Sequence, residues 1–128
     1  MIEKFDQLKG MTLAAVDGAK AGSDEIVFTL ADGSKLKLYH SQDCCESVSV
    51  EDVCGDVASL IGEPLTMAEE ATSDKNPDGV TKDYQDSFTW TFYRLATVKG
   101  YVTIRWYGES NGYYSESVDF AECGATGT

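Results

Sequence analysis

The sequence predicts an α+β fold, a mainly antiparallel β-sheet of about six to seven strands with one helix packed on one face. Short runs in which apolar and polar residues alternate make up most of the chain, as expected of strands with one buried face. Turn-forming pairs such as Asp32-Gly33 and Asn111-Gly112 separate these runs. Residues 50–64 carry apolar residues at helical spacing, which predicts a single clear helix.

The first half of the chain predicts a strand, a hairpin, a further strand and the helix. Residues 11–18 ("MTLAAVDG") form a short apolar segment ending in an Asp-Gly turn, and residues 25–40 fold into a hairpin around a second Asp-Gly. In its returning strand, His40 shares the apolar face of two leucines. After a short strand at residues 47–50 ("SVSV"), "VEDVCGDVASLIGEP" predicts the helix, with acids at its start and Gly62 at its end.

The second half predicts an antiparallel meander. Residues 64–71 ("PLTMAEEA") fit a strand or a helix, and residues 73–83 form a polar loop that we expect to be flexible. The three strands are "SFTWTFYRL", "YVTIRWY" and "YYSESVDF", and we expect the alternating aromatic residues of the first to share an apolar face with Ile104 and Trp106 of the second. The tail, residues 121–128, is expected to fray, and the whole chain, residues 1–128, to form a single domain.

Composition and charge exclude several classes of function. The chain has 128 residues, 42% of them hydrophobic, which is typical of one folded globular domain. Its net charge of −12 repels phosphate backbones, so we expect no direct nucleic-acid binding. Apolar runs of the roughly 20 residues needed to span a membrane are absent, and the first residues do not resemble a signal peptide. We therefore expect a cytoplasmic protein. Three interpretations of its acidic charge stay open: solubility, binding of a basic partner, and mimicry of nucleic acid.

The string "HSQDCCE", residues 40–46, has three interpretations. Zinc sites favour cysteines two residues apart, whereas Cys44 and Cys45 are adjacent and point to opposite faces of an extended chain. A catalytic cysteine–histidine pair is a weaker interpretation, because acidic neighbours disfavour the thiolate form that acts as the nucleophile. A polar turn with His40 on an apolar face and Asp43 bracing the loop fits best. We therefore expect no metal ligand, no catalytic residue, no cofactor and reduced cysteines, with a zinc-binding module as the remaining alternative.

The string "TIRWYGESNGYYSES", residues 103–117, is the better candidate for ligand binding. Alternation puts Arg105 and Tyr107 opposite Ile104 and Trp106, on the open face of the sheet. An arginine among tyrosines suits a phosphate beside a stacked ring, and it also suits a protein hot spot. Polar groups of the 40–46 turn add specificity if that turn folds next to the sheet. The predicted ligand-binding residues are Arg105, Tyr107, Asn111, Tyr113, Tyr114, His40, Gln42 and Asp43.

These strings also carry a family resemblance. "HSQDCCE", "LIGEP", "WTFY" and "TIRWYGESNGYYS" resemble a family of small uncharacterised proteins of tailed bacteriophages and prophages, over about residues 27–120. The resemblance brings no catalytic residues with it. It implies a protein of the host bacterial cytoplasm, and small acidic phage proteins without enzymatic motifs often counter host defence.

The sequence and the resemblance together predict a non-enzymatic counter-defence protein that sequesters a small nucleotide-derived signalling molecule. A homo-oligomer would help by building a pocket from two chains. The alternative is an acidic interaction protein that directly inhibits a host defence protein. Both hypotheses predict binding without chemical conversion of the partner.

Overall fold

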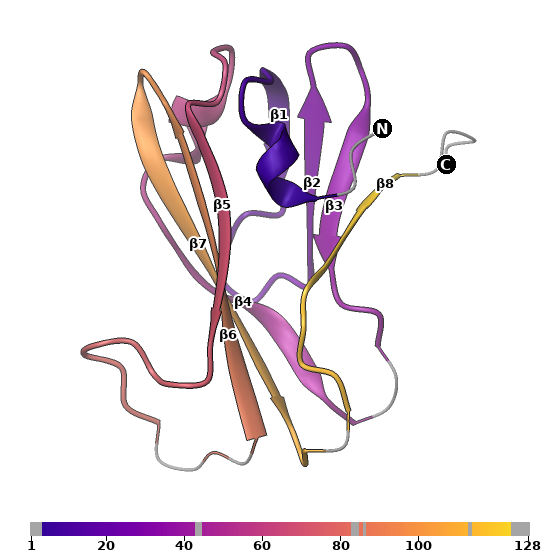
Figure 1. The fold of residues 1–128 in the computed structure, drawn as a ribbon, viewed down its shortest axis with the longest axis vertical. Coiled ribbons are helices and arrows are strands. Elements are labelled where there is room, and N and C mark those ends of the chain that lie inside the picture. The colour runs from indigo at the N-terminus through magenta and orange to yellow at the C-terminus, as the bar shows by residue number, and fades with distance from the viewer. Residues whose placement is uncertain (1–3, 43–44, 83–84, 86, 113, 124–128) are drawn as a thin grey trace.

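The computed structural model describes residues 4–42, 45–82, 85, 87–112 and 114–123. Within these residues, eight strands form two antiparallel sheets of four strands each, accompanied by two short 3-10 helices (Figure 1). The first sheet has the strand order β1-β2-β3-β8, and the second has the order β4-β7-β6-β5. The strands and helices are β1 (Leu13–Asp17), β2 (Glu25–Leu30), β3 (Lys35–Tyr39), β4 (Ser47–Cys54), β5 (Met67–Ser73), β6 (Ser87–Thr97), β7 (Gly100–Ser110), β8 (Asp119–Glu122), η1 (Phe5–Leu8) and η2 (Val57–Leu60).

The two sheets face each other across one hydrophobic core (Figure 1). Alternate residues of each strand point toward this core, as the pleat of a strand requires. Phe28 and Leu38 of the first sheet are fully buried, as are Ile104 and Trp106 of the second. The fold is therefore a mainly-β arrangement of two packed layers, and the predicted α+β class is wrong.

The helix η1 closes one end of the gap between the sheets (Figure 1). Its Phe5 side chain is only 3% exposed and contacts the ring of Phe28 in the first sheet, with ring centroids 6.1 Å apart. The same ring lies 4.6 Å from that of Tyr93 in the second sheet and 5.6 Å from that of Phe120 in β8. Phe5 thus joins both layers through apolar and aromatic contacts.

The predicted helix at residues 50–64 is absent from the structure. Residues 50–54 belong to β4, which pairs with β7 and has a bulge between Val50 and Asp52. Gly55 then has a φ of +111°, and a β-carbon at this position would lie 2.4 Å from the carbonyl oxygen of Tyr101. This close approach ends the strand, and only the four residues of η2 follow in helical form, with Asp56 accepting a bond from Ala58 N–H at their start.

The predicted meander is half correct. β6 and β7 form the expected antiparallel pair, but β8 pairs with β3 in the first sheet instead of with β7. The expected shared apolar face is also wrong, because the partners along the strands place Trp90 opposite Tyr107, whereas Trp106 lies opposite Thr91. Trp106 therefore faces the core, and Trp90 faces outward with Tyr107.

Several local predictions are confirmed. β1 lies within the expected segment at residues 11–18, and the β2–β3 hairpin turns through Gly33, which has a φ of +93°. The ambiguous residues 64–71 contribute most of β5. In the tail that was expected to fray, residues 121–122 belong to β8, and residues 124–128 lie outside the described part of the chain. None of the described helices is long and apolar enough to cross a membrane.

We expect the substitution Phe5→Ala to destabilise the protein strongly, because it removes the ring that both sheets share. The loss should be about 3–5 kcal/mol in the free energy of unfolding, measured by urea denaturation. Val98→Ala is the control, since Val98 is 78% exposed and its truncation should change stability by no more than about 0.5 kcal/mol. Equal effects of the two substitutions would contradict the role given to Phe5.

Candidate functional site

Four aromatic side chains form a cluster on the outer side of the second sheet, here called the aromatic face: Phe88, Trp90, Phe92 and Tyr107. The rings of Trp90 and Phe92 are stacked with centroids 6.1 Å apart, and those of Trp90 and Tyr107 meet edge to face at 4.9 Å. Phe88 stacks on Tyr107 at 6.0 Å. The four rings pack into one continuous aromatic cluster on the two central strands of the sheet, in which Trp90 and Tyr107 are buried and Phe88 and Phe92 are partly exposed.

Three cations lie over these rings. The Arg105 guanidinium is 5.6 Å from the Trp90 ring centroid, and the Lys82 ammonium is 4.5 Å from that of Tyr107. The Arg94 guanidinium is 5.6 Å from the ring centroid of Phe92. Such distances allow cation–π attraction, so the aromatic face gathers positive charge in a chain whose net charge is −12.

The three cations differ in how they are neutralised. Arg105 donates two hydrogen bonds to the carboxylate of Asp52, at 2.7 and 2.5 Å, and these bonds lower the pKa of Asp52. Lys82 lies 3.3 Å from a carboxylate oxygen of Glu51. Arg94 forms no ion pair with any of the described residues. Of the three, Arg94 therefore has the guanidinium best placed to receive an anion from outside.

The loop between β5 and β6 covers part of the aromatic face. Trp90 is fully buried, and its indole N–H donates to Asn76 Oδ1 at 3.0 Å. The Gln85 amide donates to the same oxygen at 3.1 Å and to the Tyr107 hydroxyl at 2.7 Å. Burial raises the pKa of Tyr107, so its hydroxyl stays protonated near neutral pH. The part of the face around Phe92 and Arg94 is less covered than Trp90.

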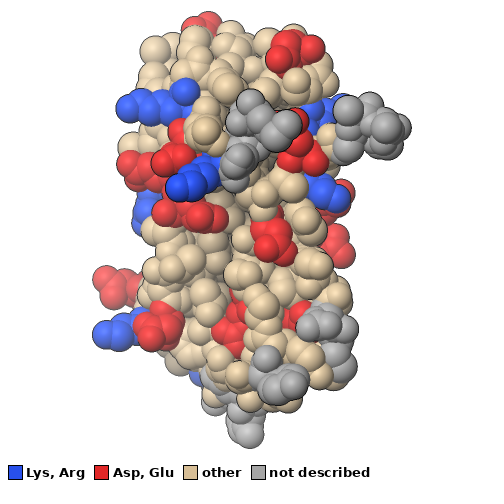
Figure 2. Space-filling view, turned by 45° about the vertical axis from the view of Figure 1, so that its right-hand side comes forward, with Lys and Arg blue, Asp and Glu red and all other residues tan. Residues whose placement is uncertain are grey.

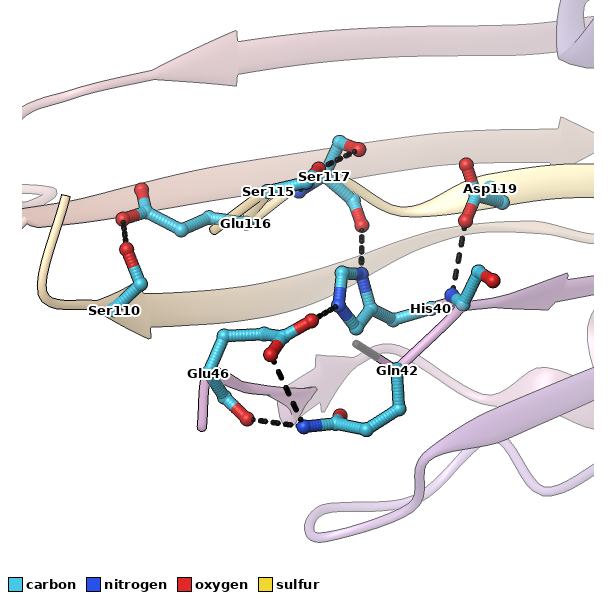
Figure 3. A network of polar contacts seen from close by, with 9 residues as sticks. His40, Gln42, Glu46, Ser110, Ser115, Glu116, Ser117 and Asp119 are labelled. Carbon is cyan, nitrogen blue, oxygen red and sulfur yellow. Dashed lines mark hydrogen bonds and ion pairs between the residues drawn. The ribbon is translucent and has the colours of Figure 1, made fainter. Parts of the chain in front are cut away.

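A second group of polar residues, here called the histidine cluster, lies where the first sheet meets the start of β4: His40, Gln42, Glu46 and Ser117 (Figure 3). His40 Nε2 is 2.6 Å from Glu46 Oε2, and Nδ1 is 2.7 Å from the carbonyl oxygen of Ser117. The side chains of His40 and Glu46 are 3% and 0% exposed. Gln42 donates from its amide to the Glu46 carbonyl oxygen at 2.7 Å. His40 and Gln42 also line an open pocket of about 350 Å³.

The bonding of His40 determines which ring nitrogen carries hydrogen. A carbonyl oxygen only accepts, so Nδ1 must donate to Ser117, and Nε2 donates to an ionised Glu46 only when the ring is charged. Burial disfavours the charged ring, but the hydrogen bonds to Glu46 and Ser117 and the charges of Glu46 and Asp119 outweigh it and raise the pKa of His40 above its ordinary value of 6.5. The imidazolium is the form that satisfies both bonds with an ionised Glu46.

Glu116 fixes the segment 115–118 against the inner side of the second sheet. Its carboxylate accepts hydrogen bonds from Ser110 Oγ at 2.5 Å and from Thr89 Oγ1 at 2.8 Å. The segment passes so close to β7 that a β-carbon on Gly108 would lie 2.5 Å from the Glu116 carbonyl oxygen. This segment brings Ser117 to His40 (Figure 3).

The structure separates the predicted ligand-binding residues into two groups. Arg105 and Tyr107 belong to the aromatic face on the outer side of the second sheet, whereas His40 and Gln42 bond to Glu46, whose buried side chain points to the inner side. Asn111 and Tyr114 follow the end of β7, and Asp43 and Tyr113 lie outside the described residues. Arg105 and Tyr107 therefore do not share an open face with His40 and Gln42, contrary to the expectation that the 40–46 turn adds polar groups to the Arg105 strand.

The described residues contain no group of three or more His, Cys, Asp or Glu side chains arranged to hold a metal ion. Cys54 and Cys123 are free thiols, as expected, whereas Cys45 is disulfide-bonded. Cys44, the other cysteine of the "HSQDCCE" string, lies outside the described residues. The adjacent-cysteine string thus supplies no described metal centre.

The predicted ligand-binding set lacks several residues of these clusters: Glu46, Lys82, Phe88, Trp90, Phe92, Arg94 and Ser117. Arg94 and Phe92 are two residues apart in one predicted strand, so alternation alone could have placed them on one face. Lys82 comes from a loop, and no periodic signal could have placed it over Tyr107. Glu46 lies two residues from Val48 on the same side of the chain, a spacing that could have indicated its inward direction.

Comparison with known proteins gives one match. A family model described as "Domain of unknown function (DUF7448)" matches residues 6–120 of the chain. None of the curated proteins matches it. None of the solved structures matches it either.

We expect Glu116→Gln to lower stability in a pH-dependent way. Burial opposes ionisation of Glu116, but hydrogen bonds from Ser110, Ser87 and Thr89 outweigh it, and its pKa falls below the ordinary 4.5. The carboxylate therefore stabilises the fold fully above pH 4.5, and this contribution disappears as the pH falls through the lowered pKa. Urea denaturation should show a deficit of about 1–2 kcal/mol at pH 7 that vanishes in acid. Glu69→Gln, at an exposed position, is the control, and a pH-independent deficit for Glu116→Gln would contradict the argument.

Proposed function

This chain belongs to the DUF7448 family, a domain of unknown function, and we propose from its own surface that it is a non-enzymatic binding protein. The aromatic face is the proposed binding surface. Aromatic rings bind planar ligands by stacking, and guanidinium and ammonium groups bind anions. A small nucleotide-type molecule combines a planar base with a phosphate, so it matches this surface in both respects.

The observation that carries the proposal is the position of Arg94. Its guanidinium lies over Phe92, which stacks in turn on Trp90, and it forms no ion pair with the described residues. A phosphate bound by Arg94 would therefore displace none of the carboxylates described around the face. Arg105, in contrast, would have to give up two hydrogen bonds to Asp52. We assign Arg94 the contact with phosphate, and Arg105 the support of the Trp90 ring.

The biological setting of the proposal rests on the resemblance of its sequence strings to those of tailed-phage proteins. In that setting the protein acts in the host bacterial cytoplasm and sequesters a nucleotide-derived signal of the host defence. Sequestration requires tight binding and no chemical conversion, which suits a preformed face whose rings and cations are already held in place by contacts within the chain. A homo-oligomer in which two aromatic faces meet would enclose such a ligand more fully.

We expect binding of a nucleotide-type ligand to depend on Arg94. Isothermal titration with cyclic and linear nucleotides and ADP-ribose derivatives should identify a ligand. Arg94→Gln should then weaken it about tenfold or more, because a charge-assisted hydrogen bond is lost. Lys37→Gln is the matched control: Lys37 also lies over a ring, 4.5 Å from the centroid of Tyr39, but in the first sheet. No heat with any member of the panel, or equal weakening by both substitutions, would refute the proposal.

The net charge favours a second candidate, an acidic interaction protein that inhibits a host defence protein by binding to a basic surface of that partner. Figure 2 shows acidic side chains dispersed along one whole side of the molecule, with basic side chains mostly in its upper half. Charges dispersed in this way attract a basic partner over a wide area rather than through one pocket. This candidate predicts a protein partner instead of a small ligand.

We expect such a partner to bind less tightly at high salt and after neutralisation of exposed acids. Asp24, Glu69 and Asp78 are suitable, because they are exposed and their side chains form no ion pair with other described residues. A pull-down from host lysate with the triple Asn/Gln/Asn variant should recover less partner than the wild type. Recovery that is independent of salt, and equal for both proteins, would refute this candidate.

A further inference from the structure

The histidine cluster joins three parts of the chain that are distant in sequence. His40 directly follows β3 of the first sheet, Glu46 directly precedes β4 of the second sheet, and Ser117 lies in the segment that leads from β7 to β8. Figure 3 shows the imidazole ring between the Glu46 carboxylate and the Ser117 carbonyl. The ring is therefore a bridge between the start of β4 and the segment 115–118.

A single proton maintains this bridge. With Nδ1 donating to Ser117, Nε2 and the Glu46 carboxylate need one further proton between them to form the 2.6 Å contact. When that proton leaves, a nitrogen lone pair faces a carboxylate in a site where both side chains are at most 3% exposed. Two acceptors at this distance repel each other, and burial prevents water from screening the repulsion.

Among the residues that the structure describes, the charges around His40 supply no substitute for the imidazolium. Asp119 of β8 accepts a hydrogen bond from Ser41 N–H at 3.0 Å, and Glu116 turns its carboxylate to Ser110 and Thr89. The neighbouring pocket is lined by Asp24 and Glu25 from the β2 side and by Tyr39 from β3. Lys37, on the same strand as Tyr39, has its ammonium 4.0 Å from Glu25. The cluster thus depends on His40 for its positive charge.

We propose that His40 and Glu46 form a pH-sensitive latch, which holds the segment 115–118 against the start of β4 while the pair carries a proton and releases it when the proton is lost. Release would separate His40 and Ser117 from the start of β4, while the hydrogen bonds from Ser110 and Thr89 keep Glu116 on the second sheet. The latch is independent of the aromatic face and does not rest on the function proposed for it. It makes the contact of residues 115–118 with the start of β4 responsive to pH.

The sign of the effect follows from the raised pKa of His40. The stabilisation is fully present below pH 6.5, the ordinary value for histidine, and disappears as the pH rises through the higher pKa of the folded protein. The latch is therefore closed in mildly acidic solution and opens toward alkaline pH.

Nuclear magnetic resonance can follow the latch directly, because His40 is the only histidine in the chain. A titration from about pH 5 to 9 should give one imidazole transition, with a midpoint above 6.5. The backbone amides of Ser41, Glu46 and Ser117 should shift with the same midpoint, and their protection from hydrogen exchange should fall about tenfold or more across it. An imidazole transition without matching changes at these amides would overturn the proposal.

Two substitutions test whether the pH response comes from the His40–Glu46 pair or only from titration of a buried ring. Glu46→Gln should lower the imidazole midpoint, because the carboxylate that favours the charged ring is gone, whereas Glu69→Gln, with the same change of charge on an exposed strand, should leave it unchanged. His40→Gln keeps a donor that does not titrate, and it should abolish the pH-dependent change in hydrogen exchange at Ser117. An unchanged midpoint in Glu46→Gln, or a persistent pH-dependent change in His40→Gln, would overturn the proposal.

Discussion

The pairing of β7 with β4 on one side and with β6 on the other determines where the candidate sites of this chain lie. Because successive side chains of β7 point to opposite sides, Trp106 enters the core while Arg105 and Tyr107 join the outer aromatic face. The same strand exposes Gly108 to the inner side, where the lack of a side chain lets the segment 115–118 approach. One central strand thus supports both the aromatic face and the histidine cluster.

The predictions that succeeded depend on neighbouring residues, and those that failed depend on distant ones. The β2–β3 hairpin follows from the Asp32-Gly33 turn pair and the alternation of apolar and polar residues beside it, so the sequence alone was sufficient to predict it. The false helix at residues 50–64 arose because Val53, Val57 and Leu60 have helical spacing, whereas β7 and the close approach at Gly55 impose a strand and a sharp end. The turn at Asn111-Gly112 could not indicate the partner of β8, because β8 pairs with β3, which lies far earlier in the chain.

The candidate sites show the same limit. Alternation correctly put Arg105 and Tyr107 on an outer face, but it could not show that Asp52 binds Arg105 across the pair β4–β7. The sequence also could not indicate which cation remains available, because that depends on which carboxylates each side chain meets in the folded chain. The turn at His40 was correctly placed at the end of a strand, but the sequence could not show that His40 bonds to Ser117, which lies 77 residues further along.

The position of β8 has a consequence for how the protein folds during its synthesis. Residues 119–122 complete the edge of a sheet whose other strands lie within residues 13–39. The last strand of the first sheet is therefore synthesised long after the other three. Contacts between such distant segments slow folding, since the chain must close a long loop before they form. Until then, the edge of β3 that pairs with β8 lacks its partner strand, and its backbone hydrogen-bonding groups are open to pairing with other chains.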